Sequence, residues 1–243
     1  MSNLSDFITY PNFWNDSLEK EFATVAMSYY PNEAICLVTK NGVELLENIS
    51  DNPENEFIVD LTTEQMEKGI GIIHSHPDSD IRPSKSDYST YIGLDMPFGI
   101  MPITADHNGI SYWIGEHLLE KPLEGRPFIH GYYDCYSLIR AYFHQELSIT
   151  INDYAREDDW WNRGEDLYGS YFTDAGFKVV NTIDGINIGD VILMKIHSPV
   201  INHAAIYLGD NKILHHLYGR LSRVDVFSNW AKVIEKVVRY SND

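Results

Sequence analysis

The chain has 243 residues, of which 44% are hydrophobic and 22% are charged, and its formal net charge is -18 at pH 7. This length can hold one large domain or two ordinary ones, and either half is long enough to bury its own core. Residues 1–118 carry 5 Lys and Arg against 19 Asp and Glu, whereas residues 119–243 carry 13 against 17. Such an acidic surface repels phosphate groups, so we expect no nucleic-acid partner.

Localisation and redox state follow from what the sequence lacks. The apolar runs fall well short of the roughly 20 residues that a membrane-spanning helix needs, so we expect no membrane insertion. Residues 1–16 are polar and acidic, which predicts no signal peptide and a chain that starts in a cytoplasm. The two cysteines, Cys36 and Cys135, lie in different halves. We therefore expect free thiols in a reducing compartment, without a disulfide scaffold or a four-cysteine zinc site.

The first half alternates apolar runs with turn signals. The predicted elements are, in chain order, a helix over 16–30, a hairpin over 34–46 with Asn41-Gly42 as its turn, a strand over 57–61, a short helix from 62, a strand over 71–74, a helix from Ser84 to about 94, and strands over 99–103 and 109–114. Ser84 and Asp87 have the spacing of a capping box at the start of a helix. Gly and Pro then interrupt regular structure, which indicates a domain boundary near 116–125 and two domains, 1–117 and 118–243.

The second half begins with an amphipathic helix over 135–147. An aromatic stretch over 154–171 follows, which we interpret as part of the core and a lid rather than a sugar-binding platform. Further predicted elements are strands over 190–196, 203–208 and 212–217, the last two joined by a turn at 209–211, a short helix over 229–234 and a strand over 237–240. No internal repeat relates the two halves.

Two histidines separated by one residue, His74 and His76, lie in a predicted extended segment. Alternate side chains of a strand point to the same face, so both rings can bind one cation. Asp87 on the following helix can supply a third ligand, and three protein ligands are typical of catalytic zinc. A carboxylate must also move a proton, and a donor such as Ser84 must stabilise the oxyanion.

The pattern His74-x-His76-Pro77, followed by Ser84-x-x-Asp87, resembles the JAMM motif of the JAB/MPN metallopeptidases, with every position filled. The resemblance implies a mixed sheet with flanking helices. It also implies that His74, His76 and Asp87 bind Zn²⁺, that Ser84 is the oxyanion donor, and that Glu33 is the general acid and base. Glu44 and Glu47 are weaker candidates for that base.

Cys135 opens a predicted helix, where the positive end of the helix dipole favours a thiolate. A histidine must accept the thiol proton, and a third polar group must orient that histidine. His203 and His215 lie on the two strands of one predicted hairpin and can face each other across it. Cys36, in an apolar run, is interpreted as a core residue.

The strings Asp134-Cys135-Tyr136-Ser137, Gly189-Asp190-Val191, His203 to Gly209 and Ile213 to His216 resemble the NlpC-type cysteine peptidases of cell-wall turnover. The resemblance implies a papain-like fold, in which a helix packs on a small antiparallel sheet. It further implies Cys135 as nucleophile, His203 as base, and His215 as the orienting residue, with His216 as the alternative. Members of this family often have a Tyr upstream of the nucleophile, where this chain has Phe128. Tyr132 or Tyr133 is the alternative source of that hydroxyl.

The order of a JAMM domain and an NlpC-type domain, with the segment 125–140, resembles the tail assembly proteins of lambda-like tailed phages. The resemblance implies a tail-tip assembly protein that contacts other tail-tip proteins, in the host cytoplasm during assembly and at the tail tip of the virion. It implies cleavage of the peptidoglycan peptide between D-glutamate and diaminopimelate. Two alternatives stay open: an assembly factor that uses its peptidase folds as docking modules, and a host enzyme outside any phage.

Overall fold

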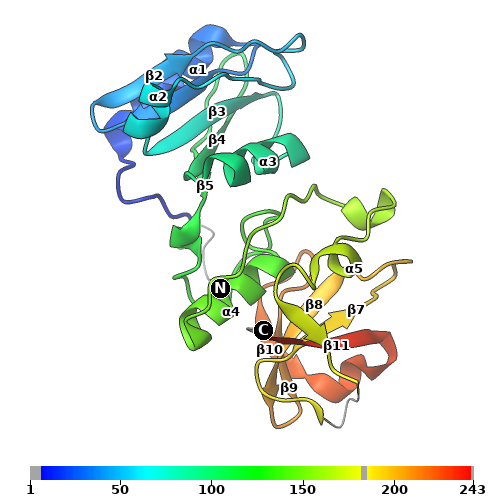
Figure 1. Ribbon diagram of the computed structural model, residues 1–243. Helices are drawn as coiled ribbons and strands as arrows, with labels where there is room; N and C mark the ends of the chain where they lie inside the picture. Colours follow the sequence, from blue (N-terminus) through cyan, green and yellow to red (C-terminus); the bar gives the residue numbers. More distant parts are fainter. Residues whose placement is uncertain (1–6, 182–184, 242–243) are drawn as a thin grey trace. The chain divides into compact units, whose positions relative to one another are not determined.

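The structure is a computed structural model that describes residues 7–181 and 185–241 (Figure 1). The chain forms two compact units, one over Ile8–Leu118 and the other from Leu119 onward together with Phe7. Each unit is built on its own β-sheet. Within the described residues, the helices are too short or too polar to cross a membrane.

The N-terminal unit contains a five-stranded mixed sheet. Its elements are α1 (Asp16–Tyr29), β1 (Ile35–Thr39), β2 (Gly42–Leu46), α2 (Thr63–Lys68), β3 (Gly71–Pro77), α3 (Lys85–Leu94), β4 (Phe98–Ile103), β5 (Tyr112–Ile114) and the 3₁₀ helix η2 (Glu116–Leu118). The strand order is β2-β1-β3-β4-β5, and β3 runs parallel to β4 while the other pairs are antiparallel. The connection between the two parallel strands carries α3, so α3 begins near the end of β3.

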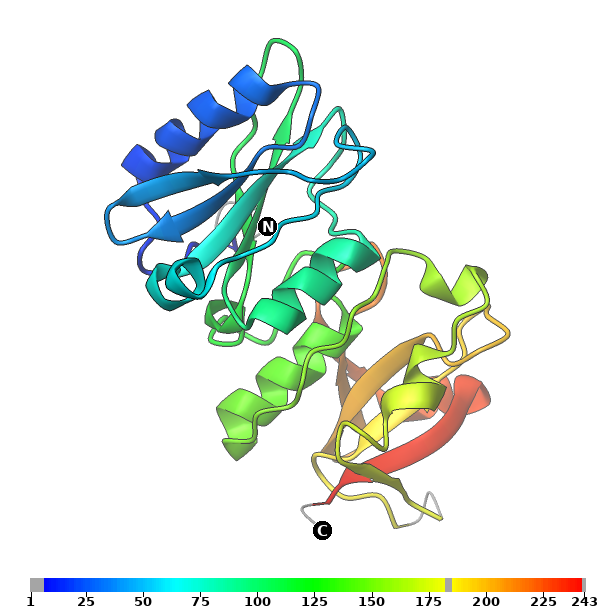
Figure 2. The ribbon, with the colours of Figure 1, turned by 45° about the horizontal axis from the view of Figure 1, so that its top comes forward.

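Helix α1 covers one face of this sheet (Figure 2). The buried residues that join the helix to the sheet include Phe22, Ala26, Cys36, Ile73 and Met101. Since Ile73 of β3 faces α1, the neighbouring side chains of His74 and His76 project from the opposite face. There the rings of Phe57 and Phe98 pack against His74, with centroids 4.8 and 4.9 Å away.

Two local predictions for this unit are wrong. Residues 57–61 form no strand, because the side chain of Asn48 accepts from the N–H of Ile58, where a strand ladder would need a backbone partner. The hairpin turn lies at Lys40-Asn41 instead of Asn41-Gly42, since Thr39 pairs with Gly42. The strand predicted over 109–114 is confirmed only for the residues of β5.

The C-terminal unit contains a six-stranded antiparallel sheet. Its elements are α4 (Cys135–Leu147), η3 (Trp160–Asn162), α5 (Leu167–Tyr171), β6 (Phe177–Val179), β7 (Val191–Met194), β8 (His203–Gly209), β9 (Lys212–His215), β10 (Arg223–Val226), η5 (Phe227–Val233) and β11 (Ile234–Tyr240). The strand order is β10-β9-β8-β7-β11-β6. The turn between β8 and β9 has positive φ at both central residues, Asp210 (47°) and Asn211 (59°), as a two-residue hairpin requires.

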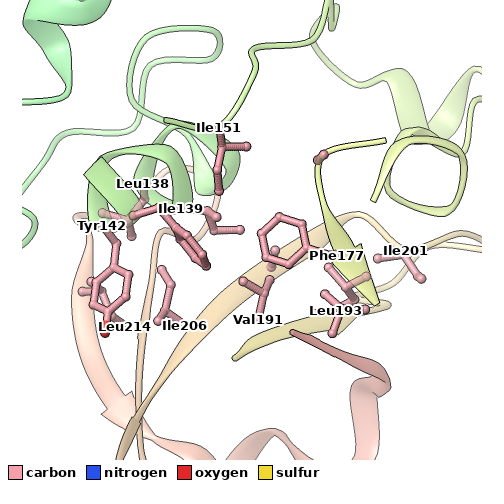
Figure 3. Packing of buried hydrophobic residues seen from close by; sticks show 14 residues of the cluster. Leu138, Ile139, Tyr142, Ile151, Phe177, Val191, Leu193, Ile201, Ile206 and Leu214 are labelled. Carbon is pink, nitrogen blue, oxygen red and sulfur yellow. The ribbon is translucent and has the colours of Figure 1, made fainter. Parts of the chain in front are cut away.

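Helix α4 packs on this sheet (Figure 3). The buried cluster between them includes Leu138, Ile139, Phe143, Val191, Leu193, Ala204, Ile206 and Leu214. The opposite face of the sheet is covered by η5, whose Trp230 packs with a second cluster that contains Ile192, Ala205 and Ile213. The sequence did not predict β6 and β10. Both are edge strands of three or four residues, too short to show a hydrophobic alternation.

Candidate functional sites

His74 and His76 lie side by side on the same face of β3, and both are buried. Each ring fixes its Nδ1 on a backbone carbonyl: His74 on Gly99 at 3.1 Å and His76 on Asp80 at 2.7 Å. Because each Nδ1 is held by a carbonyl, each Nε2 is left to bind another partner. Histidine ligands of metal sites are oriented in the same way. The Nε2 of His74 is buried and makes no hydrogen bond among the described residues.

Asp87 faces these two nitrogens from the first turn of α3. Its Oδ1 lies 3.3 Å from His74 Nε2 and its Oδ2 lies 3.4 Å from His76 Nε2. The capping box fixes it there, because Ser84 N–H donates to Asp87 Oδ2 and Asp87 N–H donates to Ser84 Oγ. Ser84 Oγ acts only as an acceptor in this cap, so its own proton is still available for a ligand.

The charges of this cluster perturb one another. Burial raises the pKa of Asp87, but His74 and His76 oppose it more strongly and hold that pKa well below its usual range. Burial likewise lowers the pKa of His76, while Asp87 raises it, and the net direction is upward. The site therefore holds an ionised carboxylate against two imidazoles.

Glu33, just before β1, has the burial and the raised pKa expected of the predicted base. It is buried, its Oε2 makes no hydrogen bond among the described residues, and burial raises its pKa against the opposing pull of His74 and His76. Glu44 instead forms an ion pair with Lys68 at 2.7 Å, and Glu47 is exposed. The electrostatic coupling to the histidines thus favours Glu33.

The donor set fits zinc. The ligand atoms of His74, His76 and Asp87 all lie within 4.8 Å of one another, and two imidazoles with one carboxylate are a common catalytic zinc set. The Nε2 atoms of His74 and His76 both face the Asp87 carboxylate, at 3.3 and 3.4 Å, so all three side chains are directed at one place, where a cation could be bound.

Cys135 is the first residue of α4, and its position is set by a buried charge network. Asp134 caps the helix by accepting from Ser137 N–H at 2.8 Å, and its Oδ2 accepts from Arg156 Nε at 2.7 Å. Arg156 also pairs with Asp153, at 2.7 Å. Burial raises the pKa of Asp134, but Arg156, His130 and the N–H of Ser137 together lower it by more, so the carboxylate stays charged and the helix start is anchored.

The thiol of Cys135 lies beside strand β8. Burial and then the charge of Asp134 raise its pKa to about 11, while the hydroxyl of Tyr168 and the backbone N–H of Ala204 lower it. Ala204 follows His203 directly, so the structure brings the predicted nucleophile to the segment that carries the predicted base. Tyr168 Oη is 3.2 Å from Cys135 Sγ.

His203 and His215 face each other across β8 and β9, with His203 Nε2 3.2 Å from His215 Nδ1. Burial, followed by His215 and His216, lowers the pKa of His203 to about 3, and burial lowers that of His215 to about 4. Both rings are therefore neutral at pH 7. If His203 donates from Nε2 to His215, its Nδ1 carries the lone pair that can accept a thiol proton.

Behind His215 lies a residue that the sequence did not suggest. His215 Nε2 is 3.7 Å from Asp225 Oδ2, and Arg223 pairs with the same oxygen at 3.0 Å. The alternative third residue, His216, instead places its Nε2 3.1 Å from the carbonyl of Arg220. Neither Asp225 nor Tyr168 is part of a sequence motif that could have predicted its place in the site. Both are brought there by tertiary packing, of β10 and of the 154–171 segment.

Comparison with known proteins agrees with this two-part architecture. The model of prokaryotic homologs of the JAB domain matches residues 15–123, and the NlpC/P60 family model matches residues 125–239. Tail tip assembly protein K of Escherichia phage N15 is 31% identical over 229 residues, which cover 89% of this chain and 91% of that protein. The chain belongs to the tail tip assembly protein K family. The family member of Escherichia phage lambda is 32% identical over 181 residues, which cover 74% of this chain and 86% of that protein.

The predicted resemblance to the lambda-like tail assembly proteins is thereby confirmed, as is the fold class of a JAB-like domain followed by an NlpC/P60 domain. Among solved structures, the NlpC/p60 domain of peptidoglycan hydrolase SagA is 20% identical, with a TM-score of 0.34 over 48% of this chain and 89% of that chain. NlpC1 from Trichomonas vaginalis is 16% identical, with a TM-score of 0.35 over 55% of this chain and about half (51%) of that chain.

Proposed function

We propose that this K-family protein acts at the phage tail tip, in contact with other tail-tip proteins, and carries two peptidase sites. We assign a zinc metallopeptidase-like domain to residues 1–117 and a cysteine peptidase domain to residues 118–243. The protein is placed in the host cytoplasm during assembly and at the tail tip of the virion. The observation that carries the proposal is the pairing of His203 Nε2 with His215 Nδ1, because His203 lies on β8, the strand whose Ala204 N–H contacts the Cys135 thiol.

The cysteine site cleaves the bond between D-glutamate and diaminopimelate in peptidoglycan peptides. His203 Nδ1 takes the proton of Cys135 as Sγ bonds to the carbonyl carbon, and the π electrons move to oxygen. The C–N bond then breaks, and His203 returns the proton to the leaving amine. Water, deprotonated by His203, hydrolyses the thioester and regenerates the thiol. His215 accepts from His203 Nε2–H throughout and keeps the ring in the productive tautomer.

In the N-terminal site, His74, His76 and Asp87 would hold Zn²⁺, which acts as a Lewis acid toward a carbonyl group. Glu33 accepts and returns a proton, a role that suits a carboxyl group whose pKa burial has raised. The Ser84 hydroxyl donates to the developing oxyanion. The bond cleaved here is a peptide or isopeptide bond, such as one in a tail-protein precursor.

Hydrolysis of the soluble peptide L-Ala–γ-D-Glu–diaminopimelate–D-Ala tests the cysteine site. The full chain should release diaminopimelate–D-Ala, detected by mass spectrometry, and Cys135→Ala should abolish this. His76→Ala is the matched control, since it alters only the other site, and it should retain the activity. Equal cleavage by the wild type and Cys135→Ala would show that Cys135 is not the nucleophile.

Elemental analysis tests the metal site. We expect about one zinc per purified chain, lost in His74→Ala and retained in His107→Ala, which removes an exposed histidine of the same domain. Equal zinc content in both variants would refute the ligand assignment. The docking alternative makes a different prediction: phage with the Cys135→Ala, His76→Ala double substitution would still form infectious particles, whereas the enzymatic proposal predicts a loss of infectivity.

A further inference from the structure

The hydroxyl of Tyr168 lies 3.2 Å from the sulfur of Cys135, although the two residues are 33 positions apart. Tyr168 belongs to α5, in the aromatic segment between α4 and β6. Its ring packs against Trp160, with centroids 6.1 Å apart, and against Tyr136, at 6.3 Å. These contacts hold the ring in place, so the hydroxyl is a fixed feature of the thiol's surroundings.

Phe128, Tyr133 and Tyr136, three other aromatic residues of the segment around the nucleophile, do not offer such a group. Phe128 has no hydroxyl, and its ring packs on His216 and Tyr218. The hydroxyl of Tyr133 donates to the carbonyl of Phe7 at 3.0 Å, and that of Tyr136 donates to the carbonyl of Asn152 at 2.7 Å. The expectation that Tyr133 could supply the hydroxyl is therefore not supported by its geometry.

We propose that Tyr168 is a catalytic residue of the Cys135 site, whose hydroxyl donates a hydrogen bond first to the thiolate and then to the oxyanion. The second role rests on the proposed peptidase function, whereas the first does not. An oxygen on the carbon that is bonded to Sγ is separated from the sulfur by one atom. A donor 3.2 Å from the sulfur is thus within reach of that oxygen.

The step conserves protons and electrons. The thiol proton passes to His203, the S–C bond forms, and the carbonyl π pair becomes an oxyanion that accepts the Tyr168 O–H without taking its proton. When the C–N bond breaks, the oxyanion electrons restore the carbonyl bond and the amine takes the proton from His203. Burial, followed by the neighbouring Cys135, holds the pKa of Tyr168 well above its usual value, so the hydroxyl remains a donor.

Tyr168→Phe removes the oxygen and keeps the ring. Tyr136→Phe is the matched control, because it also removes a tyrosine hydroxyl from the same aromatic cluster, but one that bonds to a backbone carbonyl. Two readouts are compared in the full chain: kcat and KM on the tetrapeptide, and the rate at which iodoacetamide alkylates Cys135 at pH 8.5, located by mass spectrometry. Circular dichroism verifies that each variant is folded.

For Tyr168→Phe we expect kcat to fall roughly 10²- to 10³-fold with KM within about two-fold, the usual effect of removing one oxyanion donor. We also expect about 10-fold slower alkylation, since the thiolate loses a charge-assisted hydrogen bond. Tyr136→Phe should change neither. Equal or faster alkylation in Tyr168→Phe overturns the proposal, as does an unchanged or higher kcat. If the wild type does not cleave the tetrapeptide, the proposed function fails, and alkylation alone decides whether Tyr168 stabilises the thiolate.

Discussion

Mild acid should destabilise the C-terminal domain selectively, because this domain buries several histidines in the neutral form, and three of them have strongly lowered pKa values. Burial lowers the pKa of His203 to about 3 and those of His215 and His216 to about 4. In the unfolded chain each should titrate near 6.5. A group whose pKa is lower in the folded state binds its proton only on unfolding, so stability is full above pH 6.5 and is lost as the pH falls.

The magnitude follows from the same values. At pH 5 each histidine is neutral in the folded state and almost fully protonated in the unfolded state, which costs about 2 kcal/mol. The three together lower the free energy of unfolding by about 6 kcal/mol between pH 7.5 and pH 5, a large share of the 5–15 kcal/mol typical of a domain. Most carboxylates stay ionised above pH 5 and contribute little in this window.

The assay is urea unfolding at pH 5 to 7.5. Unfolding of the domain is monitored by hydrogen-exchange mass spectrometry of peptides from β7, β8 and β9, and the exchange rates are corrected for the pH dependence of intrinsic exchange. Between pH 6 and pH 5 the free energy of unfolding should fall by about 4 kcal/mol as the pH decreases by one unit. This slope corresponds to about three protons bound on unfolding. His216→Gln should reduce this slope by about one proton. The control, His144→Gln, removes a partly exposed histidine of the same domain and should leave the slope nearly unchanged. A wild-type slope below one proton, or equal slopes in wild type and His216→Gln, would refute the reasoning.

Three further substitutions test the structure of this domain. Arg156→Met leaves the buried carboxylate of Asp134 without its ion-pair partner and should lower the free energy of unfolding by about 3–5 kcal/mol, measured by urea denaturation; a loss below 1 kcal/mol would contradict the buried pair. Leu138→Ala creates a cavity under α4 and should lower the free energy of unfolding by about 2–5 kcal/mol in the same assay. An unchanged free energy of unfolding would contradict the packing of α4 on the sheet. Asp225→Asn removes the charge beside His215 Nε2 and should lower kcat at least about 10-fold, part of the 10²–10⁴ that general-base catalysis contributes. An unchanged kcat and pH profile would show that Asp225 only supports the sheet.

Several elements of this protein depend on local information, and the sequence was sufficient to predict them. Helix α4 begins at Cys135 and ends at Leu147 as predicted, since an Asp134 cap and a regular apolar face specify it. The Ser84–Asp87 capping box and the projection of His74 and His76 from one face of β3 are likewise local. The failed strand over 57–61 has the opposite cause: its alternation was right, but the Asn48 side chain occupies a backbone group that a strand needs.

The composition of both sites was decided by contacts between distant segments. His74 and His76 are two residues apart, but Asp87 joins them only because α3 connects two parallel strands and starts beside the end of the first. Nothing in the spacing of residues placed Tyr168 on the sulfur of Cys135 or Asp225 behind His215. Capping and side-chain alternation act over a few residues and leave a pattern in the sequence, whereas the packing of a short irregular helix or an edge strand depends on the whole sheet and leaves none.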